Sequence, residues 1–310
     1  MTLLREPLLA AARSPRLRTV AEKSRLARPV VNRFVAGSKE RDALRVAGEL
    51  IGSGMLVSLD FLGEDTTSRQ QADHTISAYR SLLAELARAG HGGRVEVSVK
   101  LSAIGQSLPG DGQRIALDGA RAICEAAELA GTTVTLDMED HTTTDSTLAI
   151  LGELRGDFPW VGAVLQAYLK RTEGDCRDLA GDGSRVRLCK GAYAEPDSVA
   201  FTGEAVEESY LRCLDVLLGG DGYPMIATHD PAMLATARSM VAEHARAADT
   251  FEFQMLFGVR PDEQRAIAAA GNRMRVYVPY GDEWYGYFMR RLAERPANLT
   301  FFLRSLASKR

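Results

Sequence analysis

Short apolar, β-branched runs alternate with longer segments along most of the chain. Eight such runs follow residue 54. They cover Met55–Leu62, Val95–Leu101, Thr133–Met138, Val161–Tyr168, Val186–Tyr193, Tyr223–His229, Thr250–Leu256 and Met274–Pro279. Because turn residues or polar groups separate these runs, the pattern predicts eight β-strands.

The segments between the runs are long enough for helices, and most carry apolar positions at a spacing of three or four. The clearest examples are Ile76–Ala89, Arg114–Ala130, Glu204–Leu218, Pro231–His244 and Pro261–Ala270. Strands that alternate with helices pair in parallel, because a parallel crossover needs a dozen residues or more. The pattern therefore favours an α/β fold of the (β/α)₈ TIM-like barrel type, with an open doubly wound sheet as the structural alternative.

Both ends of the chain differ from this repeat. Residues 1–54 have a helical pattern without a strand signal, which predicts an N-terminal helical segment before a barrel of residues 55–310. After Gly281, an acidic start and a stop at Pro296 predict a further helix. An amphipathic tail, Leu299–Leu306, follows it.

Composition and charge exclude several classes of protein. The net charge of −3 gives no reason to expect nucleic-acid binding. The four cysteines lack CxxC spacing, and no apolar run has the length of a membrane span, so we expect a cytoplasmic protein without disulfides or zinc. Residues 1–54 hold eleven Lys or Arg against five Asp or Glu, which is compatible with a solvated helical face or with contact to an anionic membrane surface.

Polar side chains gather where the predicted strands end, and that end of a barrel carries the active site. The groups are Asp60; Lys100 and Ser102; Asp137, Glu139 and Asp140; Gln166; Arg187 and Lys190; Thr228, His229 and Asp230; Gln254; and Tyr277. Charged groups in apolar strands are costly unless they are paired or used. So many strand ends with polar groups indicate a site, without naming its chemistry.

Two chemistries that this mouth could perform stay open as alternatives. A metal could be held by Asp137, Glu139, His229 and Asp230, although no HxH or HExxH spacing is present. A Schiff base could form at Lys100 or Lys190, as in aldolase-type barrels.

A flavin is a third alternative. The chain lacks a dinucleotide fingerprint after a strand. Donors at strand ends could nevertheless bind a flavin, and Arg187 and Lys190 offer positive charge for a pyrophosphate. In the last predicted helix, Arg290 and Arg291 could grip a carboxylate, or Arg290 could form a surface ion pair with Glu294.

Eight ordered motifs, one for nearly every strand and one for the last helix, resemble the proline dehydrogenase family in its short monofunctional bacterial form. They are Val97–Ser102, Leu136–Glu139, Leu165–Arg171, Arg187–Tyr193, Ala227–His229, Phe251–Leu256, Arg275–Pro279 and Tyr287–Arg291. The resemblance implies a distorted (β/α)₈ barrel that binds FAD noncovalently and oxidises L-proline to 1-pyrroline-5-carboxylate. Residues 1–54 carry none of these motifs.

The resemblance also implies roles for individual residues. Arg290 and Arg291 would bind the proline carboxylate with help from Lys100, and Asp137 and Arg187 would be catalytic, with Arg187 near flavin N5. The ring of proline would be walled by Leu256, Tyr277 and Tyr287. FAD would contact Met138, Gln166, Arg187, Lys190, Gly191, Ala192, Thr228, His229 and Glu294.

Family members pass electrons to a quinone, so the resemblance adds a quinone as a partner. It also adds peripheral contact with the inner face of the cell membrane, through the basic N-terminal segment or the tail, as a hypothesis. A chain of 310 residues has no room for a fused aldehyde dehydrogenase, so the product would pass to a separate pyrroline-5-carboxylate dehydrogenase. A non-catalytic barrel that acts as an interaction module is the alternative from a different class.

Overall fold

The computed structural model describes residues 31–64 and 66–294, without the side chains of residues 290 and 292–294. Eight parallel strands close into a barrel in chain order, from β1 to β8, and β8 pairs with β1. The strands are β1 Leu56–Phe61, β2 Val95–Val99, β3 Thr133–Leu136, β4 Gly162–Gln166, β5 Arg185–Cys189, β6 Tyr223–Ala227, β7 Glu252–Leu256 and β8 Met274–Tyr280. The predicted barrel is confirmed, and the open sheet is excluded.

Strand β2 shows why these sequences form a barrel with two different faces. Successive side chains of a strand point to opposite faces. Val95, Val97 and Val99 lie on one face and belong to the main apolar core. Glu96 and Ser98 alternate with them, are buried, and bond to side chains of other strands inside the barrel. The helices therefore cover apolar faces, whereas the barrel interior is polar.

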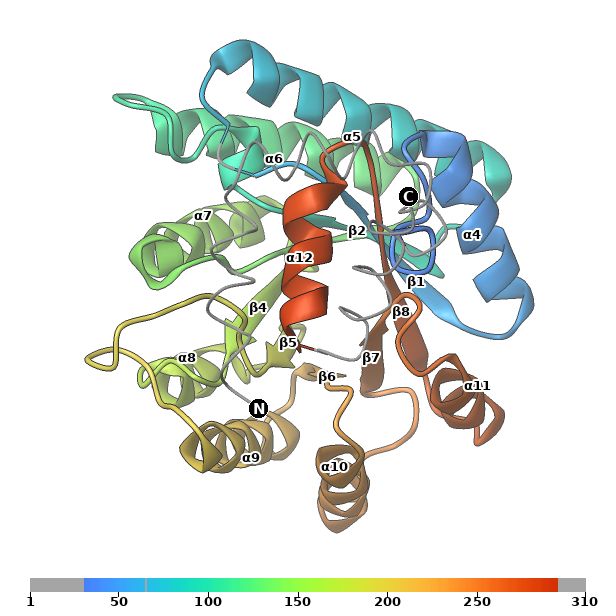
Figure 1. Cartoon of the computed structure of the whole chain (residues 1–310), viewed down its shortest axis with the longest axis vertical. Coiled ribbons are helices and arrows are strands. Elements are labelled where there is room, and N and C mark those ends of the chain that lie inside the picture. The colour runs from blue at the N-terminus through green and yellow to red at the C-terminus, as the bar shows by residue number, and fades with distance from the viewer. Residues whose placement is uncertain (1–30, 65, 295–310) are drawn as a thin grey trace, which may run out of the picture.

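Helices surround the strands (Figure 1). They are α5 Arg69–Ala89, α6 Gly112–Leu129, α7 Thr144–Asp157, α8 Thr172–Leu179, α9 Glu204–Gly219, α10 Pro231–Glu243 and α11 Pro261–Ala269, with short 3₁₀ turns at Ser102–Ile104 and His141–Thr143. Helix α5 begins seven residues before the predicted Ile76, since Ser68 caps it by accepting a hydrogen bond from the Gln71 amide. Its first two turns are mostly exposed, so they carry little apolar periodicity.

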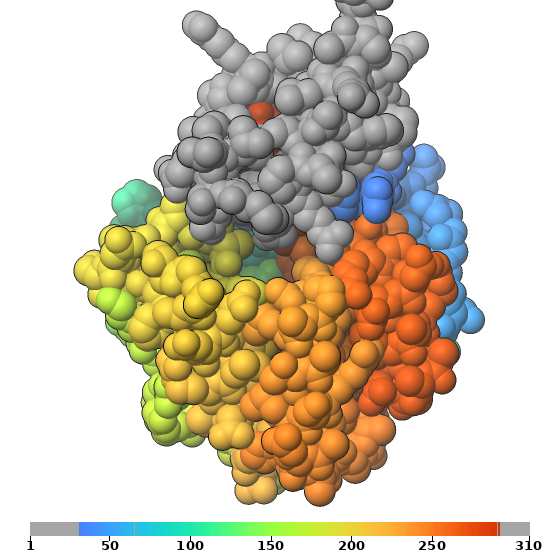
Figure 2. Space-filling model, turned by 60° about the horizontal axis from the view of Figure 1, so that its bottom comes forward, coloured from blue at the N-terminus to red at the C-terminus, as the bar shows by residue number. Residues whose placement is uncertain are grey.

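Two helices depart from a regular barrel. Helix α4, Glu40–Gly52, precedes the first strand and packs against β1 and β8, where the helix after β8 would normally lie. Helix α12, Trp284–Glu294, instead lies across the barrel opening (Figure 1). In Figure 2, α8 to α11 follow one another around the outside in chain order, and the blue segment with α4 adjoins the orange-red segment. The barrel is therefore distorted, as predicted.

A separate apolar cluster holds α12 over the mouth. Tyr285, Tyr287 and Phe288 of α12 pack with Leu62, which follows β1, and with Val259, which follows β7. The larger core lies between the barrel and its helices. Residues 31–54 thus include one helix on the barrel wall, while the proposed division at residue 54 stays a prediction.

Candidate active site

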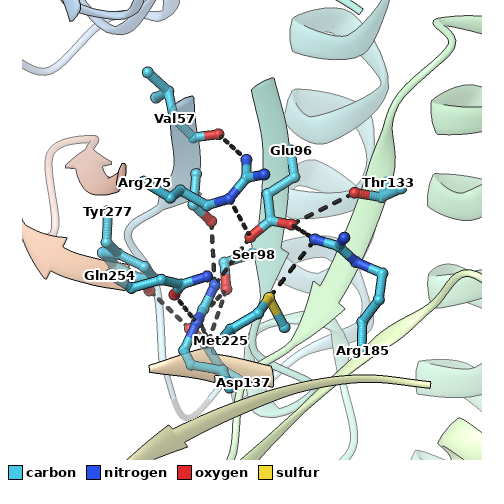
Figure 3. A network of polar contacts seen from close by, with 12 residues as sticks. Val57, Glu96, Ser98, Thr133, Asp137, Arg185, Met225, Gln254, Arg275 and Tyr277 are labelled. Carbon is cyan, nitrogen blue, oxygen red and sulfur yellow. Dashed lines mark hydrogen bonds and ion pairs between the residues drawn. The ribbon is translucent and has the colours of Figure 1, made fainter. Parts of the chain in front are cut away.

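The inside of the barrel is filled with paired charges rather than with apolar layers. Among the described residues, four carboxylates and four cations lie there on six strands or directly after them: Asp60, Glu96, Asp137 and Glu252, with Lys100, Arg185, Arg187 and Arg275. Their formal charges cancel. Figure 3 shows part of this network, with Glu96 between Arg185 and Arg275.

At the carboxyl ends of the strands, Lys100 lies between two carboxylates. Its Nζ is 2.8 Å from Asp60 Oδ2 and 3.5 Å from Asp137 Oδ2. Lys100 also donates to the Tyr277 hydroxyl at 3.3 Å, and that hydroxyl donates to Asp137 Oδ2 at 2.7 Å. The structure therefore brings together three of the predicted site residues, and adds Asp60 as the partner that anchors the lysine.

Arg187 is held on every side by this interior. Its guanidinium donates to Asp137 Oδ1 at 2.7 Å, Ser98 Oγ at 3.0 Å, Glu96 Oε1 at 3.1 Å, Ser58 Oγ at 3.3 Å and Gln254 Oε1 at 2.6 Å. A guanidinium has five N–H groups, so these acceptors match its full donor set. Any further hydrogen bond from Arg187 to a bound molecule would have to share or replace one of them.

The charges fix the protonation states of the upper cluster. Burial alone would raise the pKa of Asp137, but Lys100 and Arg187 lower it overall, so this carboxyl is ionised. Burial raises the pKa of Asp60, and Lys100 offsets this only in part. Burial would lower the pKa of Lys100, but Asp60 and Asp137 together raise it. Burial also raises the pKa of Tyr277 well above its usual value, which keeps its hydroxyl a donor.

A second charged layer lies beneath Arg187, toward the amino ends of the strands. Glu96 accepts from Arg187 and from Arg185, and Glu252 accepts two hydrogen bonds from Arg275, at 2.6 and 3.1 Å. Sequence reasoning missed this layer because it considered only strand ends. The signal was present: in β2 and β7 the polar residues recur at every second position, which marks an inward-facing polar row.

The expected cofactor residues at the ends of β4 and β5 form one group. Gln166 is buried and donates from Nε2 to the Met138 carbonyl, while its Oε1 has no hydrogen-bond partner among the described residues. Gly191 has a φ of +104°, and a Cβ there would come within 2.2 Å of the Tyr168 ring. Only glycine fits such a position, next to Ala192.

The remaining expected cofactor residues lie toward β6, apart from the charged cluster. Lys190 pairs with Glu207 at 2.8 Å and Asp230 at 3.4 Å. The Thr228 hydroxyl accepts from the Asp230 amide at 3.2 Å. His229 Nε2 accepts from the Leu256 amide at 2.8 Å, so the neutral ring carries its proton on Nδ1.

Helix α12 supplies the roof of the site. Tyr287 is buried, and Leu256 and Tyr277 pack against its cluster, which joins the three residues expected to wall a ring. The Arg291 guanidinium lies 5.2 Å from the Tyr287 ring centre. Arg290 and Glu294 belong to α12, but their side chains lie outside the described residues.

The structure bears on the metal alternative and on a Schiff base at Lys100. No group of three or more His, Cys, Asp or Glu within residues 31–64 and 66–294 could hold a metal ion. A Schiff-base lysine needs an amine that loses its proton readily. Lys100 has the opposite environment, since its two carboxylate neighbours raise its pKa. In the same described part of the chain, no helix is long and apolar enough to cross a membrane.

Comparisons with known proteins agree on one family. A model of the proline dehydrogenase family matches residues 43–304. The chain is 39% identical to proline dehydrogenase 1 of Bacillus subtilis (strain 168) over 278 residues, which cover 89% of this chain and 90% of that protein. It is 37% identical to the proline dehydrogenase of Deinococcus radiodurans over 309 residues, which cover 98% of each.

A solved structure gives the same result for the fold. The chain is similar to proline utilization A from Bdellovibrio bacteriovorus inactivated by N-propargylglycine, with a TM-score of 0.80 and 25% identity. The match covers 92% of this chain and 34% of that protein, so the chain spans about a third of its length.

Proposed function

The chain belongs to the proline dehydrogenase family and is a proline dehydrogenase enzyme, and from this premise we propose that it oxidises L-proline to 1-pyrroline-5-carboxylate with noncovalently bound FAD. The observation that carries the proposal is the contact cluster of Lys100, Asp137, Arg187 and Tyr277 beneath α12. It combines fixed cations, an ionised carboxylate and an apolar roof, which suits a small zwitterion.

FAD fits the residues that line the mouth from β4 to β6. The buried Gln166 Oε1 offers an acceptor, and Lys190 offers positive charge for a pyrophosphate. Gly191 follows Lys190 and lets the chain turn beside the Tyr168 ring. We assign cofactor contacts to these residues and to Met138, Arg187, Ala192, Thr228, His229 and Glu294. When bound, FAD supplies a two-electron acceptor whose N5 receives the hydride.

Substrate binding rests on the cations and the aromatic roof. Arg290 and Arg291 bind the proline carboxylate, aided by Lys100, which keeps its charge because its pKa is raised. Leu256, Tyr277 and Tyr287 enclose the ring. These contacts hold the proline carbon that donates the hydride in a fixed position, and such positioning lowers the barrier of the reaction.

The cationic surroundings also prepare the substrate amine. Hydride leaves the carbon next to nitrogen only when the nitrogen lone pair is free, so the proline ammonium must lose its proton. Burial beside cations lowers the pKa of an ammonium. Asp137 keeps Lys100, Arg187 and the Tyr277 hydroxyl in their orientations, since it contacts all three.

The later steps and the location are proposed on the family resemblance. When bound, FAD would give up its electrons to a quinone, and a pyrroline-5-carboxylate dehydrogenase would take the product. We place the enzyme in the cytoplasm, with peripheral contact at the inner face of the membrane through the basic N-terminal segment or the tail. Both segments lie mostly outside the described residues.

A titrated absorption spectrum tests the central proposal. Purified protein should be yellow, and its flavin bands should bleach on addition of L-proline but far less with hydroxyproline, because Tyr277 crowds a ring substituent. A colourless protein that takes up no FAD would refute the proposal and return attention to a non-catalytic or aldolase-type barrel. Flotation with anionic and neutral liposomes tests membrane contact separately, and absence of binding to both would contradict it.

A further inference from the structure

Arg187 joins the site to the charged layer beneath it. Its Nη1 donates upward to Asp137, which also contacts Lys100 and Tyr277. Its Nη2 and Nε donate to Glu96 and Gln254 in the layer below. The plane of this guanidinium is therefore set from both sides, and only residues on the upper side have a role in the proposed reaction so far.

Glu96 is the shared acceptor of this lower layer. One carboxylate oxygen lies 3.1 Å from Arg187 Nη2 and 3.8 Å from Arg275 Nε, and the other lies 3.0 Å from Arg185 Nη2. Burial alone would raise the pKa of Glu96, but the three arginines lower it to about 2, so it is an anion at every physiological pH. Glu96 balances cations that would otherwise repel one another.

A second arm reaches Arg187 through an amide. Gln254 Oε1 accepts from Arg187 Nε at 2.6 Å, while Gln254 Nε2 donates to Glu252 Oε1 at 2.6 Å. Glu252 is in turn fixed by two hydrogen bonds from Arg275. Because a carboxylate can only accept, Glu252 forces the amide nitrogen toward itself and turns the amide oxygen toward Arg187.

We propose that Glu96 and the Glu252–Gln254 pair are positioning residues for the oxidation of proline, which act by fixing the plane and the local charge of the Arg187 guanidinium. Each of them is linked to Arg187, because Glu96 and Gln254 accept hydrogen bonds from its guanidinium and Glu252 orients the Gln254 amide. The inference rests on the proposed function, because that function places Arg187 in contact with the flavin. The competing explanation is that these charges only stabilise the barrel.

Glu96→Gln in the FAD-loaded enzyme separates the two explanations, because it keeps the size of the side chain and removes its charge. We expect kcat to fall roughly tenfold to a hundredfold, as for small misplacements near a reacting centre. KM for proline should change less than about threefold, since α12 and Lys100 are untouched. The matched control is Asp175→Asn. Asp175 is a buried carboxylate on the outer helix α8 that pairs with Arg171, and its replacement should leave kcat unchanged.

A double-mutant cycle with Arg187→Met gives the sharper test. If Glu96 acts through Arg187, the loss of kcat in the double variant should equal that in Arg187→Met alone. The reduction potential of bound FAD should also rise in Glu96→Gln, because less negative charge opposes Arg187. A tenfold gain in the affinity for reduced over oxidised FAD corresponds to about 30 mV.

Additive losses in the cycle, or a potential that moves no more than in Asp175→Asn, would overturn the inference and leave a purely structural role. If Glu96→Gln does not fold, Gln254→Met carries the same cycle, since it removes an acceptor and no charge. A wild-type protein that is not reduced by proline would refute the proposed function and this inference together. A wild-type protein that is reduced, with an additive cycle, would refute the positioning role alone.

Discussion

Replacing Lys100 by methionine should destabilise the fold in a strongly pH-dependent way, because it leaves the Asp60 carboxylate buried without its cation. The two side chains are only 8% and 0% exposed, and their charged atoms are 2.8 Å apart. Removing one partner of a buried pair usually costs about 3 to 5 kcal/mol, because the remaining charge cannot reach water. Asp137, another anion nearby, adds to that cost.

Protonation limits how large the effect can become. A stranded carboxyl can always take up a proton, and holding it protonated costs about 1.36 kcal/mol for each pH unit above its ordinary pKa of 3.8. The limit is about 5 kcal/mol at pH 7.5 and about 1.6 kcal/mol at pH 5. With about 2.1 cal/mol/K of unfolding entropy per residue over 310 residues, these values correspond to losses of about 8 and 2.5 K in Tm.

The sign follows from proton linkage. A carboxyl whose pKa is raised in the folded state binds a proton that the unfolded chain releases, so stability falls as pH rises above the ordinary pKa. Thermal unfolding of Lys100→Met and wild type at pH 5 and pH 7.5 measures the difference. The double variant Lys100→Met with Asp60→Asn should recover most of the loss at pH 7.5, whereas Lys170→Met, at an exposed lysine, should lose less than about 1 kcal/mol at both pH values. Equal losses at both pH values, or no recovery in the double variant, would refute the reasoning.

Three further predictions follow from individual positions. Glu139 accepts hydrogen bonds from the Ser102 amide and hydroxyl, and burial raises the pKa of Glu139 to about 7. Wild type should therefore lose stability relative to Glu139→Gln as pH rises from 4.5 to 7. A difference in Tm between the two proteins that stays constant over this range would contradict the prediction. Gly191→Ala should displace the Tyr168 ring and weaken the binding of FAD about tenfold, as measured by equilibrium dialysis. The control is Gly183→Ala, because Gly183 also has a positive φ but a Cβ there would meet no atom within 4 Å, so this variant should retain FAD. Arg290→Met should raise KM for proline strongly while FAD stays bound, and loss of FAD at unchanged KM would refute the assigned role.

Much of the fold was predictable because its signals are local. Apolar runs such as Val95–Leu101 recur eight times, and most of the segments between them carry helical spacing such as that in Arg114–Ala130, which predicts parallel pairing of the strands. The prediction that polar groups gather at the carboxyl ends of the strands also uses local information, because it requires only the chain direction of each strand. The first six strands were predicted to end too late, because the hydrogen-bonded ladder stops before the residues that turn into the mouth, whereas β8 runs one residue beyond its predicted end.

The sequence by itself determined which segments form the strands and helices, and it predicted a polar site at the carboxyl ends of the strands. Only the tertiary structure decided how these groups pair. Lys100 reaches Asp60, Asp137 and Tyr277 because β2 lies between β1 and β3 and β8 closes onto β1, and no local pattern encodes that closure. In the sequence, Glu96 is a single charge within an apolar strand. Closure of the barrel places Arg185, Arg187 and Arg275 around it, and these opposite charges make a buried carboxylate stable.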